Sequence, residues 1–130
     1  MDTAAHPTDL RGLANAQAVS LTTYKRDGTA VVTPVNLAVD GDRGYFRTWT
    51  TSGKAKRLRR DGRITIAPCT FRGMVTGDYL PAKALRIKGD EAEQARRLIE
   101  HKHPILQGLL VRFGHRLTGR QTAYYLVTAA

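Results

Sequence analysis

Residues 50–60 read TTSGKAKRLRR and place a Ser-Gly pair before a dense run of cationic side chains. The segment from Gly53 to Arg60 is rich in helix-forming residues, and Ser52 stands where an N-cap is expected. The first amides of a helix have no intrahelical partners and carry the positive end of its dipole. Gly53 lets an anion approach the backbone and Lys54 adds a full charge, so the segment predicts a phosphate-binding site.

Three more hydroxyl side chains precede this cap, at Thr48, Thr50 and Thr51. The chain has a formal net charge of +10, and residues 47–63 hold seven Lys and Arg side chains against a single acid, Asp61. Such focused charge predicts an anionic partner, which could be a nucleic acid, an acidic membrane surface or a polyanionic small molecule. The alternative is that these side chains form a basic helix face that is exposed to solvent and binds no partner.

The rest of the chain predicts β-strands with short helical segments between them. The strands expected from period-two patterns and turn signals cover residues 17–24, 30–39, 44–49, 63–71, 83–88 and 122–128. Besides residues 53–60, two helices are expected: residues 105–113, and a helix opened by a cap pair of Asp90 and Glu93 with an apolar stripe of Ala92, Ala95, Leu98 and Ile99. We therefore predict one mainly β (α+β) domain over residues 1–130, in which six antiparallel strands close a small barrel.

Pro34 interrupts the second predicted strand, where it cannot donate a ladder hydrogen bond. It therefore predicts either an edge strand or a bulge at this position. A bulge would turn side chains toward a ligand, whereas an edge proline needs no role in a site, and the sequence fits both.

Composition argues against several classes of protein. The single cysteine, Cys69, cannot form an internal disulfide, which predicts a reducing cytoplasm. No apolar run approaches the ~20 residues of a membrane span, and the first residues, MDTAAHPTDLRG, lack the pattern of a secretory signal. His101 and His103 are two residues apart, a poor spacing for sharing one helix face, so no metal site is predicted.

The order of these segments resembles the split β-barrel flavin and deazaflavin oxidoreductases, a superfamily that includes pyridoxamine 5′-phosphate oxidases and the actinobacterial reductases that use coenzyme F420. The resemblance rests on a β-hairpin, a TPVN strand, a YFRTW strand and the TTSGKAKRL segment, and it covers the chain from about residue 19 to residue 128. In that family a Thr-x-x-x-Ser-x-Lys segment binds the cofactor phosphate. This motif maps onto Thr48, Ser52 and Lys54.

The resemblance also implies a location for the cofactor ring and an assembly. The hairpin strand before the phosphate motif flanks the ring, which implies cofactor contacts from residues 33–36, including Thr33, Val35 and Asn36. Proteins of this fold are homodimers with two cofactor sites at the subunit interface, so a homodimer is expected here.

Two departures from the oxidase pattern favour the deazaflavin branch. Pyridoxamine phosphate oxidases carry an Arg and a Lys on the strand that reads VVTPVNL here, and an Arg before the phosphate-binding Lys, where this chain has Gly53. Coenzyme F420 resembles a flavin whose phosphate is extended by lactate and a chain of glutamates. A tail with several carboxylates needs an extended cationic track, for which the candidates are Lys56, Arg57, Arg60 and Arg120. FMN is the alternative cofactor.

The reaction implied is hydride transfer from the reduced cofactor to an electrophilic small molecule, and the ring itself carries the difficult step. No catalytic acid or base is therefore predicted. Tyr79 fits a buried strand tyrosine better than a proton donor, and Trp49 fits a cofactor contact as well as a core or interface aromatic. Two other functions stay open: a cofactor carrier without turnover, and a nonspecific nucleic-acid-binding domain, although no aromatic residues are interleaved with the basic cluster.

Overall fold

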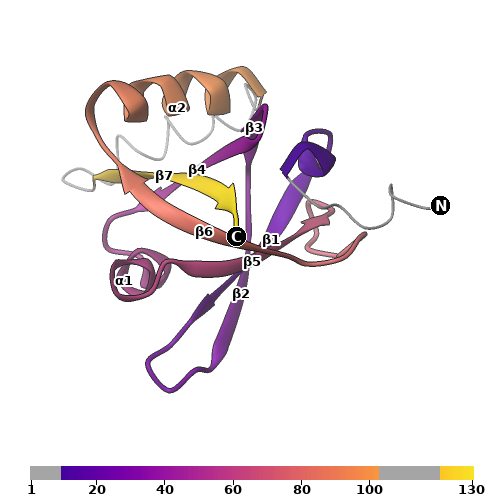
Figure 1. Cartoon of the computed structure of the whole chain (residues 1–130), viewed down its shortest axis with the longest axis vertical. Helices are drawn as coiled ribbons and strands as arrows, with labels where there is room; N and C mark the ends of the chain where they lie inside the picture. The colour runs from indigo at the N-terminus through magenta and orange to yellow at the C-terminus, as the bar shows by residue number, and fades with distance from the viewer. Residues whose placement is uncertain (1–9, 103–120) are drawn as a thin grey trace.

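A computed structural model describes residues 10–102 and 121–130 of the chain. Its seven strands form one antiparallel sheet in the order β2-β1-β5-β6-β7-β4-β3, which curls into a partly open barrel (Figure 1). The strands are β1 (Ala18–Tyr24), β2 (Ala30–Val35), β3 (Ala38–Asp40), β4 (Arg43–Trp49), β5 (Arg63–Cys69), β6 (Leu80–Ile87) and β7 (Thr122–Ala129). The mainly β fold class is confirmed.

The strand count differs from the prediction, because the strand expected over residues 30–39 is two strands. The chain leaves β2 after Val35 and begins β3 at the opposite edge of the sheet, so Asn36 and Leu37 join the two edges covalently. Leu37 is buried in the core, where its side chain fills the space beside Gly44. A Cβ on Gly44 would lie 3.0 Å from Leu37 Cδ1, so the glycine makes this inward turn of Leu37 possible.

Two further strand boundaries differ from the predicted ones. Residues 70 and 71 lie outside β5, which ends at Cys69, and β6 begins at Leu80 rather than at Lys83. The earlier start of β6 follows from alternation, since Leu80, Ala82 and Ala84 all point into the core. Pro34 lies on β2, which is an edge strand of the sheet. Of the two alternatives predicted for Pro34, the edge strand is therefore confirmed.

The barrel interior is filled by alternating side chains of the strands and by a short N-terminal 3-10 helix, η2 (Leu10–Leu13). Phe46 on β4 is fully buried and stacks on Tyr125 of β7, directly opposite in the register, with ring centroids 5.0 Å apart. Helix α1 (Gly53–Arg60) packs against β1 and β4 and buries Ala55 and Leu58, of which Leu58 belongs to this core.

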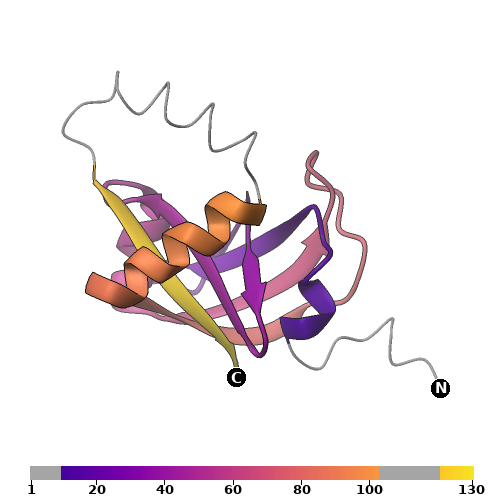
Figure 2. The ribbon, with the colours of Figure 1, turned by 90° about the horizontal axis from the view of Figure 1, so that it is seen from above.

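Helix α2 (Gly89–Lys102) covers the outer face of the sheet over β3, β4 and β7 (Figure 2). Its predicted apolar stripe is confirmed, because Ala95 and Ile99 are buried with Ala92 and Leu98 packed beside them. The predicted cap pair is wrong: the helix begins at Gly89, and Glu93 accepts a hydrogen bond from Arg96 instead of reaching back to Asp90. The predicted helix over residues 105–113, His103 and Arg120 lie outside the described residues.

Candidate anion-binding site

The start of α1 has the geometry expected of a capped helix. Ser52 is extended, with φ −70° and ψ 156°, and its Oγ accepts the Ala55 amide hydrogen at 3.0 Å. Thr48 Oγ1 donates a second hydrogen bond to the same oxygen at 3.1 Å. Since Ser52 Oγ already accepts twice, its own hydroxyl hydrogen is directed outward, where it can be donated to a ligand.

Two cationic side chains gather at this helix start. The Arg57 guanidinium folds back over Gly53, so that a Cβ on Gly53 would lie 2.8 Å from an Arg57 Nη. Arg57 Nε donates to Thr23 Oγ1 on β1 at 2.6 Å, which fixes the guanidinium between the strand and the helix. The Lys54 ammonium is half-buried beside it. Burial, and then the charge of Arg57, lower the pKa of Lys54 below its usual value.

This arrangement is electrostatically incomplete without an anion. Lys54 and Arg57 lie at the positive end of the helix dipole, and neither pairs with an acid within residues 10–102 and 121–130. Cations are ordinarily favoured at the other end of a helix. A bound phosphate would receive hydrogen bonds from the free helix amides, Ser52 Oγ and both cations, and would offset their repulsion. We call Thr48, Ser52, Gly53, Lys54 and Arg57 the cradle.

The inner side of β2 borders the cradle. Thr23, which accepts the hydrogen bond from Arg57, lies opposite Val31 in the register, and Thr33 lies opposite Leu21. Alternation therefore turns Val31 and Thr33 to the α1 side of the sheet. Asn36 is half-buried directly after the strand. The cofactor contacts predicted for Thr33, Val35 and Asn36 thus have a common location, along β2 and its end.

Four further predicted residues, Trp49, Thr50, Thr51 and Lys56, are not part of the cradle as defined above. Trp49 follows Arg47 by two positions on β4, and Arg47 faces Glu100 of α2, so Trp49 points to the face opposite Thr48. Thr51 and Lys56 are exposed, and the Thr50 amide donates to Gln121 O. Their contacts with a cofactor stay predictions.

Tyr79 is not the buried strand tyrosine that was predicted. It is 46% exposed and precedes β6, because the chain there has not yet entered the sheet. Its hydroxyl lies 3.3 Å from Ser20 Oγ on the outer side of β1. Cys69 is buried, and burial raises the pKa of its thiol, as expected of a small apolar filler.

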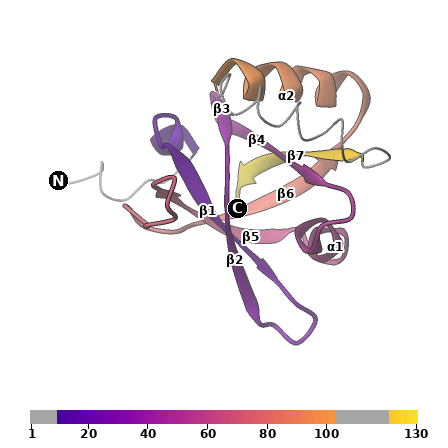
Figure 3. The ribbon, with the colours of Figure 1, turned by 180° about the vertical axis from the view of Figure 1, so that it is seen from behind.

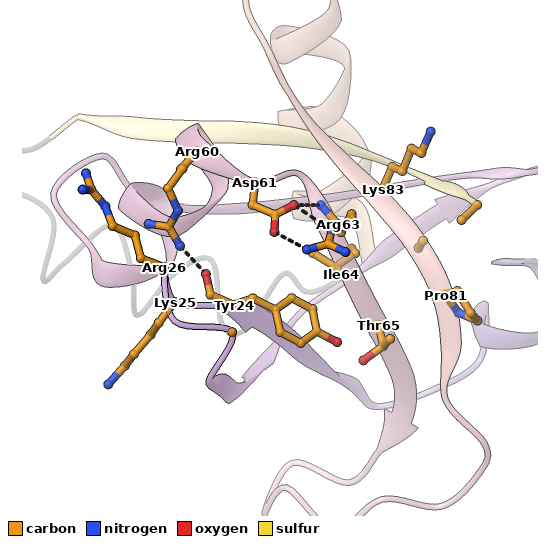
Figure 4. A pocket seen from close by; sticks show the side chains of 13 residues that line it. Tyr24, Lys25, Arg26, Arg60, Asp61, Arg63, Ile64, Thr65, Pro81 and Lys83 are labelled. Atoms are coloured by element: carbon orange, nitrogen blue, oxygen red, sulfur yellow. Dashed lines mark hydrogen bonds and ion pairs between the residues drawn. The ribbon is translucent and has the colours of Figure 1, made fainter.

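A second cationic region lies beyond the C-terminal end of α1 (Figure 4). A hollow of about 620 Å³ opens between the tip of the β1–β2 hairpin, the end of α1 and the beginnings of β5 and β6. Its lining includes the cationic side chains of Lys25, Arg26, Arg60, Arg63 and Lys83. We call this region the cationic hollow.

Ion pairing neutralises only part of the hollow. Arg63 binds Asp61 through two hydrogen bonds, Nε to Oδ1 at 3.1 Å and Nη2 to Oδ2 at 3.0 Å. The Arg63 side chain holds the pKa of the Asp61 carboxyl below its usual value. Arg60 Nη2 instead donates to Tyr24 O at 2.7 Å, so its charge stays available to a ligand. Of the hollow's cationic residues, sequence analysis proposed only Arg60 as a ligand contact. The basic Lys25-Arg26 pair at the hairpin tip was the signal for the others.

The described residues contain no group of three or more His, Cys, Asp or Glu side chains that could hold a metal ion. Within the same ranges, none of the helices is long and apolar enough to cross a membrane.

The family model described as pyridoxamine 5′-phosphate oxidase matches residues 8–103. The chain belongs to the pyridoxamine 5′-phosphate oxidase family. The predicted resemblance is thereby confirmed at the family level, and the oxidase family lies in a superfamily of split-barrel proteins that bind flavin or deazaflavin cofactors. None of the curated proteins matches this chain in sequence.

Solved structures share the fold of this oxidase family member. A protein of unknown function from Agrobacterium tumefaciens has a TM-score of 0.71 at 20% identity, over 91% of this chain and 51% of its own. A structure described as an F420-H2 dependent reductase has a TM-score of 0.61 at 13% identity, over 85% of this chain and 93% of its own. One described as a domain-swapped dimer has a TM-score of 0.61 at 14% identity, over 85% and 79%. This chain thus spans about half the length of the Agrobacterium protein.

Proposed function

We propose that this protein binds the deazaflavin coenzyme F420 and is an F420H2-dependent oxidoreductase that reduces an electrophilic small molecule. The observation that carries the proposal is the pair of separate cationic regions at the two ends of α1. The cradle fits one phosphate, and the hollow fits further anionic groups. FMN has a phosphate but no tail to occupy the hollow.

The chain's own residues would bind and orient the cofactor. The cradle hydroxyls, amides and cations hold the phosphate, and β2 lies beside them for the ring. When bound, reduced F420 supplies the hydride. Thr33 on this strand and Asn36 after it are half-buried and would limit the access of water to that side of the ring.

The two cationic regions are spaced for one extended ligand. Helix α1 has eight residues and is therefore about 12 Å long, so a chain that leaves the phosphate at its start needs only a few linked residues to reach the hollow. Arg60 then meets the tail together with Lys25, Arg26 and Lys83. Arg57 belongs to the phosphate instead, because its guanidinium is fixed over Gly53.

The alternatives have less support. A nucleic-acid-binding helix would present its arginines as a solvated row, but Arg57 and Arg60 are each held by a hydrogen bond to β1, to Thr23 Oγ1 and Tyr24 O. A carrier of F420 without turnover would share every contact proposed here, and only a substrate screen separates it from an enzyme. We also propose that the protein is cytoplasmic and forms a homodimer. The similar structure described as a domain-swapped dimer supports the homodimer.

Fluorescence titration with F420 and FMN side by side tests the cofactor. We expect F420 to bind with a micromolar or lower Kd, which corresponds to ~8 kcal/mol, and FMN to bind more weakly because it lacks the tail. Equal or tighter binding of FMN would overturn the proposal. Oxidation of reduced F420 in a screen of electrophilic small molecules then tests turnover.

Substitution of Arg60 tests the role of the hollow. Arg60→Ala should weaken F420 binding by ~1 kcal/mol or less, because its partner is a solvated carboxylate, and the loss should shrink as salt rises. A cofactor fragment that keeps the phosphate but lacks the glutamates should bind equally to the parent and the variant. Arg97→Ala, which removes an exposed cation from α2, is the matched control and should change neither affinity. If Arg60→Ala lost the same affinity for F420 as for the fragment, the glutamate tail would have to bind away from Arg60.

A further inference from the structure

Lys102 lies at the C-terminal end of α2, but its side chain is not extended into solvent as that of a helix-end lysine usually is. Its ammonium donates a hydrogen bond to the Leu37 carbonyl oxygen at 2.6 Å, across 65 positions of sequence. The side chain is half-buried, and burial lowers the pKa of its ammonium. Within residues 10–102 and 121–130 no acid forms an ion pair with it, so this cation is held in place without a counter-charge.

The carbonyl that Lys102 reaches belongs to the connection between β2 and β3. Asn36 and Leu37 form this connection, which joins the two edge strands of the sheet. Helix α2 packs on β3, and Figure 3 shows the C-terminal end of the helix beside that strand. Lys102 therefore brings a positive charge to the end of β2, a strand whose own six residues are all uncharged.

Asn36 is a second polar group at this point. Its carboxamide is half-buried and makes no hydrogen bond to another residue of the described part of the chain. A carboxamide offers an acceptor oxygen and two donor hydrogens, and an ammonium offers three donor hydrogens, of which the Leu37 carbonyl takes one. Partly buried groups with unused hydrogen-bonding capacity are stabilised by a polar ligand. We call Asn36 and Lys102 the polar pair.

The polar pair and the cradle lie toward opposite ends of β2. Arg57 of the cradle is bound to Thr23, which lies opposite Val31 near the beginning of the strand. The six positions from Val31 to Leu37 span at most ~20 Å of extended chain. A phosphate in the cradle, a ribityl chain and a three-ring system can cover this separation, with a hydrogen bond at each end. A ring that lies along β2 then has one edge at the polar pair.

We propose that Lys102 contacts the cofactor ring and, together with Asn36, binds its imide edge, the –CO–NH–CO– side that flavin and deazaflavin rings share. The Asn36 carboxamide accepts the imide hydrogen and donates to one carbonyl oxygen, and the Lys102 ammonium donates to the other. This inference rests on the proposed cofactor site. It adds to that site a residue of α2, a helix that otherwise only covers the sheet.

The charge of Lys102 should change the electronic properties of the bound ring. Reduction makes the ring more electron-rich, and a cation beside its carbonyl oxygens stabilises the reduced state. The reduction potential of the bound cofactor should therefore become more negative when Lys102 is replaced by an uncharged residue. A lysine that only held the connection between β2 and β3 would leave this potential unchanged.

Fluorescence titration of Lys102→Met with F420 tests the contact, because methionine keeps a flexible apolar side chain and removes the charge. We expect the Kd to rise about 10-fold or more, as for the loss of a hydrogen bond to a charged group, and the reduction potential of the bound cofactor to become more negative. A ring-free fragment with the phosphate and the glutamates, measured by competition with F420, should bind the variant and the parent equally. Lys102→Arg keeps the charge and should retain most of the affinity. Lys88→Met removes an exposed lysine before the other end of α2 and is the matched control, which should change neither affinity nor potential.

Equal affinity of the parent and Lys102→Met for F420 would overturn this inference alone. An unchanged reduction potential, or an equal loss of affinity for the ring-free fragment, would show that Lys102 acts only by holding the connection and would also overturn the contact. If the parent prefers FMN, the same titration with FMN decides the inference, because FMN has the same imide edge, and only the choice of cofactor is refuted. A parent that binds neither ring refutes both proposals.

Discussion

Replacing Lys54 by alanine should weaken F420 binding by ~1.5–3 kcal/mol, or roughly 10- to 150-fold in Kd, the range of a hydrogen bond to a charged group. The reason is location: the ammonium is half-buried at the positive end of α1, next to Arg57, where a phosphate is its natural counterion. Fluorescence titration measures the loss. The cofactor fragment without glutamates should lose affinity by the same factor, because Lys54 lies in the cradle and not in the hollow.

Two measurements separate this role from a structural one. Lys54→Ala should not lower the melting temperature of the unliganded protein, since it removes a partly desolvated charge that Arg57 repels. Lys56→Ala, the next cation on the helix, is exposed and should cost ~1 kcal/mol or less. If Lys54→Ala binds both ligands as well as the parent does, the phosphate site lies elsewhere.

The affinity for F420 should depend on pH in a defined direction. Because the pKa of Lys54 is lowered, its ammonium loses the proton at a lower pH than an exposed lysine does, and the neutral amine binds phosphate poorly. The affinity of the parent for F420 should therefore fall as pH rises through that lowered pKa. Lys54→Arg stays charged throughout this range and should show no such fall.

Replacing Phe46 by alanine should cost about 3–5 kcal/mol of folding free energy, the largest effect we expect of any single substitution. Phe46 has no exposed surface, and its ring stacks on Tyr125, which joins β4 to β7 at the middle of their pairing. Removing the ring leaves a cavity that the surrounding strands cannot close. For a domain of this size the melting temperature should fall by roughly 10–20 °C in a thermal unfolding experiment.

Phe46→Leu is the matched control. It retains most of the buried volume and loses only the ring stacking, so it should cost ~1–2 kcal/mol. A Phe46→Ala protein that melts within a few degrees of the parent would show that β4 and β7 are held together by other contacts.

The parts of the molecule that sequence analysis predicted correctly depend on local signals. The Ser52 cap is one of them, because a cap is defined by residues within one helical turn. The α2 stripe and the edge position of Pro34 are others. The family resemblance added the expectation that the TTSGKAKRL segment binds a cofactor phosphate, where residue types alone indicated an unspecified anion site, and this expectation stays a prediction.

The parts that were missed depend on contacts between distant residues. The strand over residues 30–39 kept its period-two pattern through Leu37, and only the position of β3 beside β4 shows that the chain changes sheet edge there. The hollow combines residues 25–26, 60–63 and 81–83, which no spacing rule connects. Strand alternation sends the side chains of Thr48 and Trp49 to opposite faces, and a cofactor contact of Trp49 stays a prediction.

The strand order has a consequence for biosynthesis. β7 is the last of these strands in chain order, yet it lies between β6 and β4, and its pairs reach as far back as Arg43 with Thr128. Before β7 is made, the growing chain can pair β2-β1-β5-β6 and β4-β3 only as two pieces with no strand pairing between them. Helix α1 packs against β1 in one piece and β4 in the other, so the cradle has no fixed shape until β7 joins them. A ribosome-bound chain that stops before residue 122 should therefore carry every cradle residue and bind no cofactor.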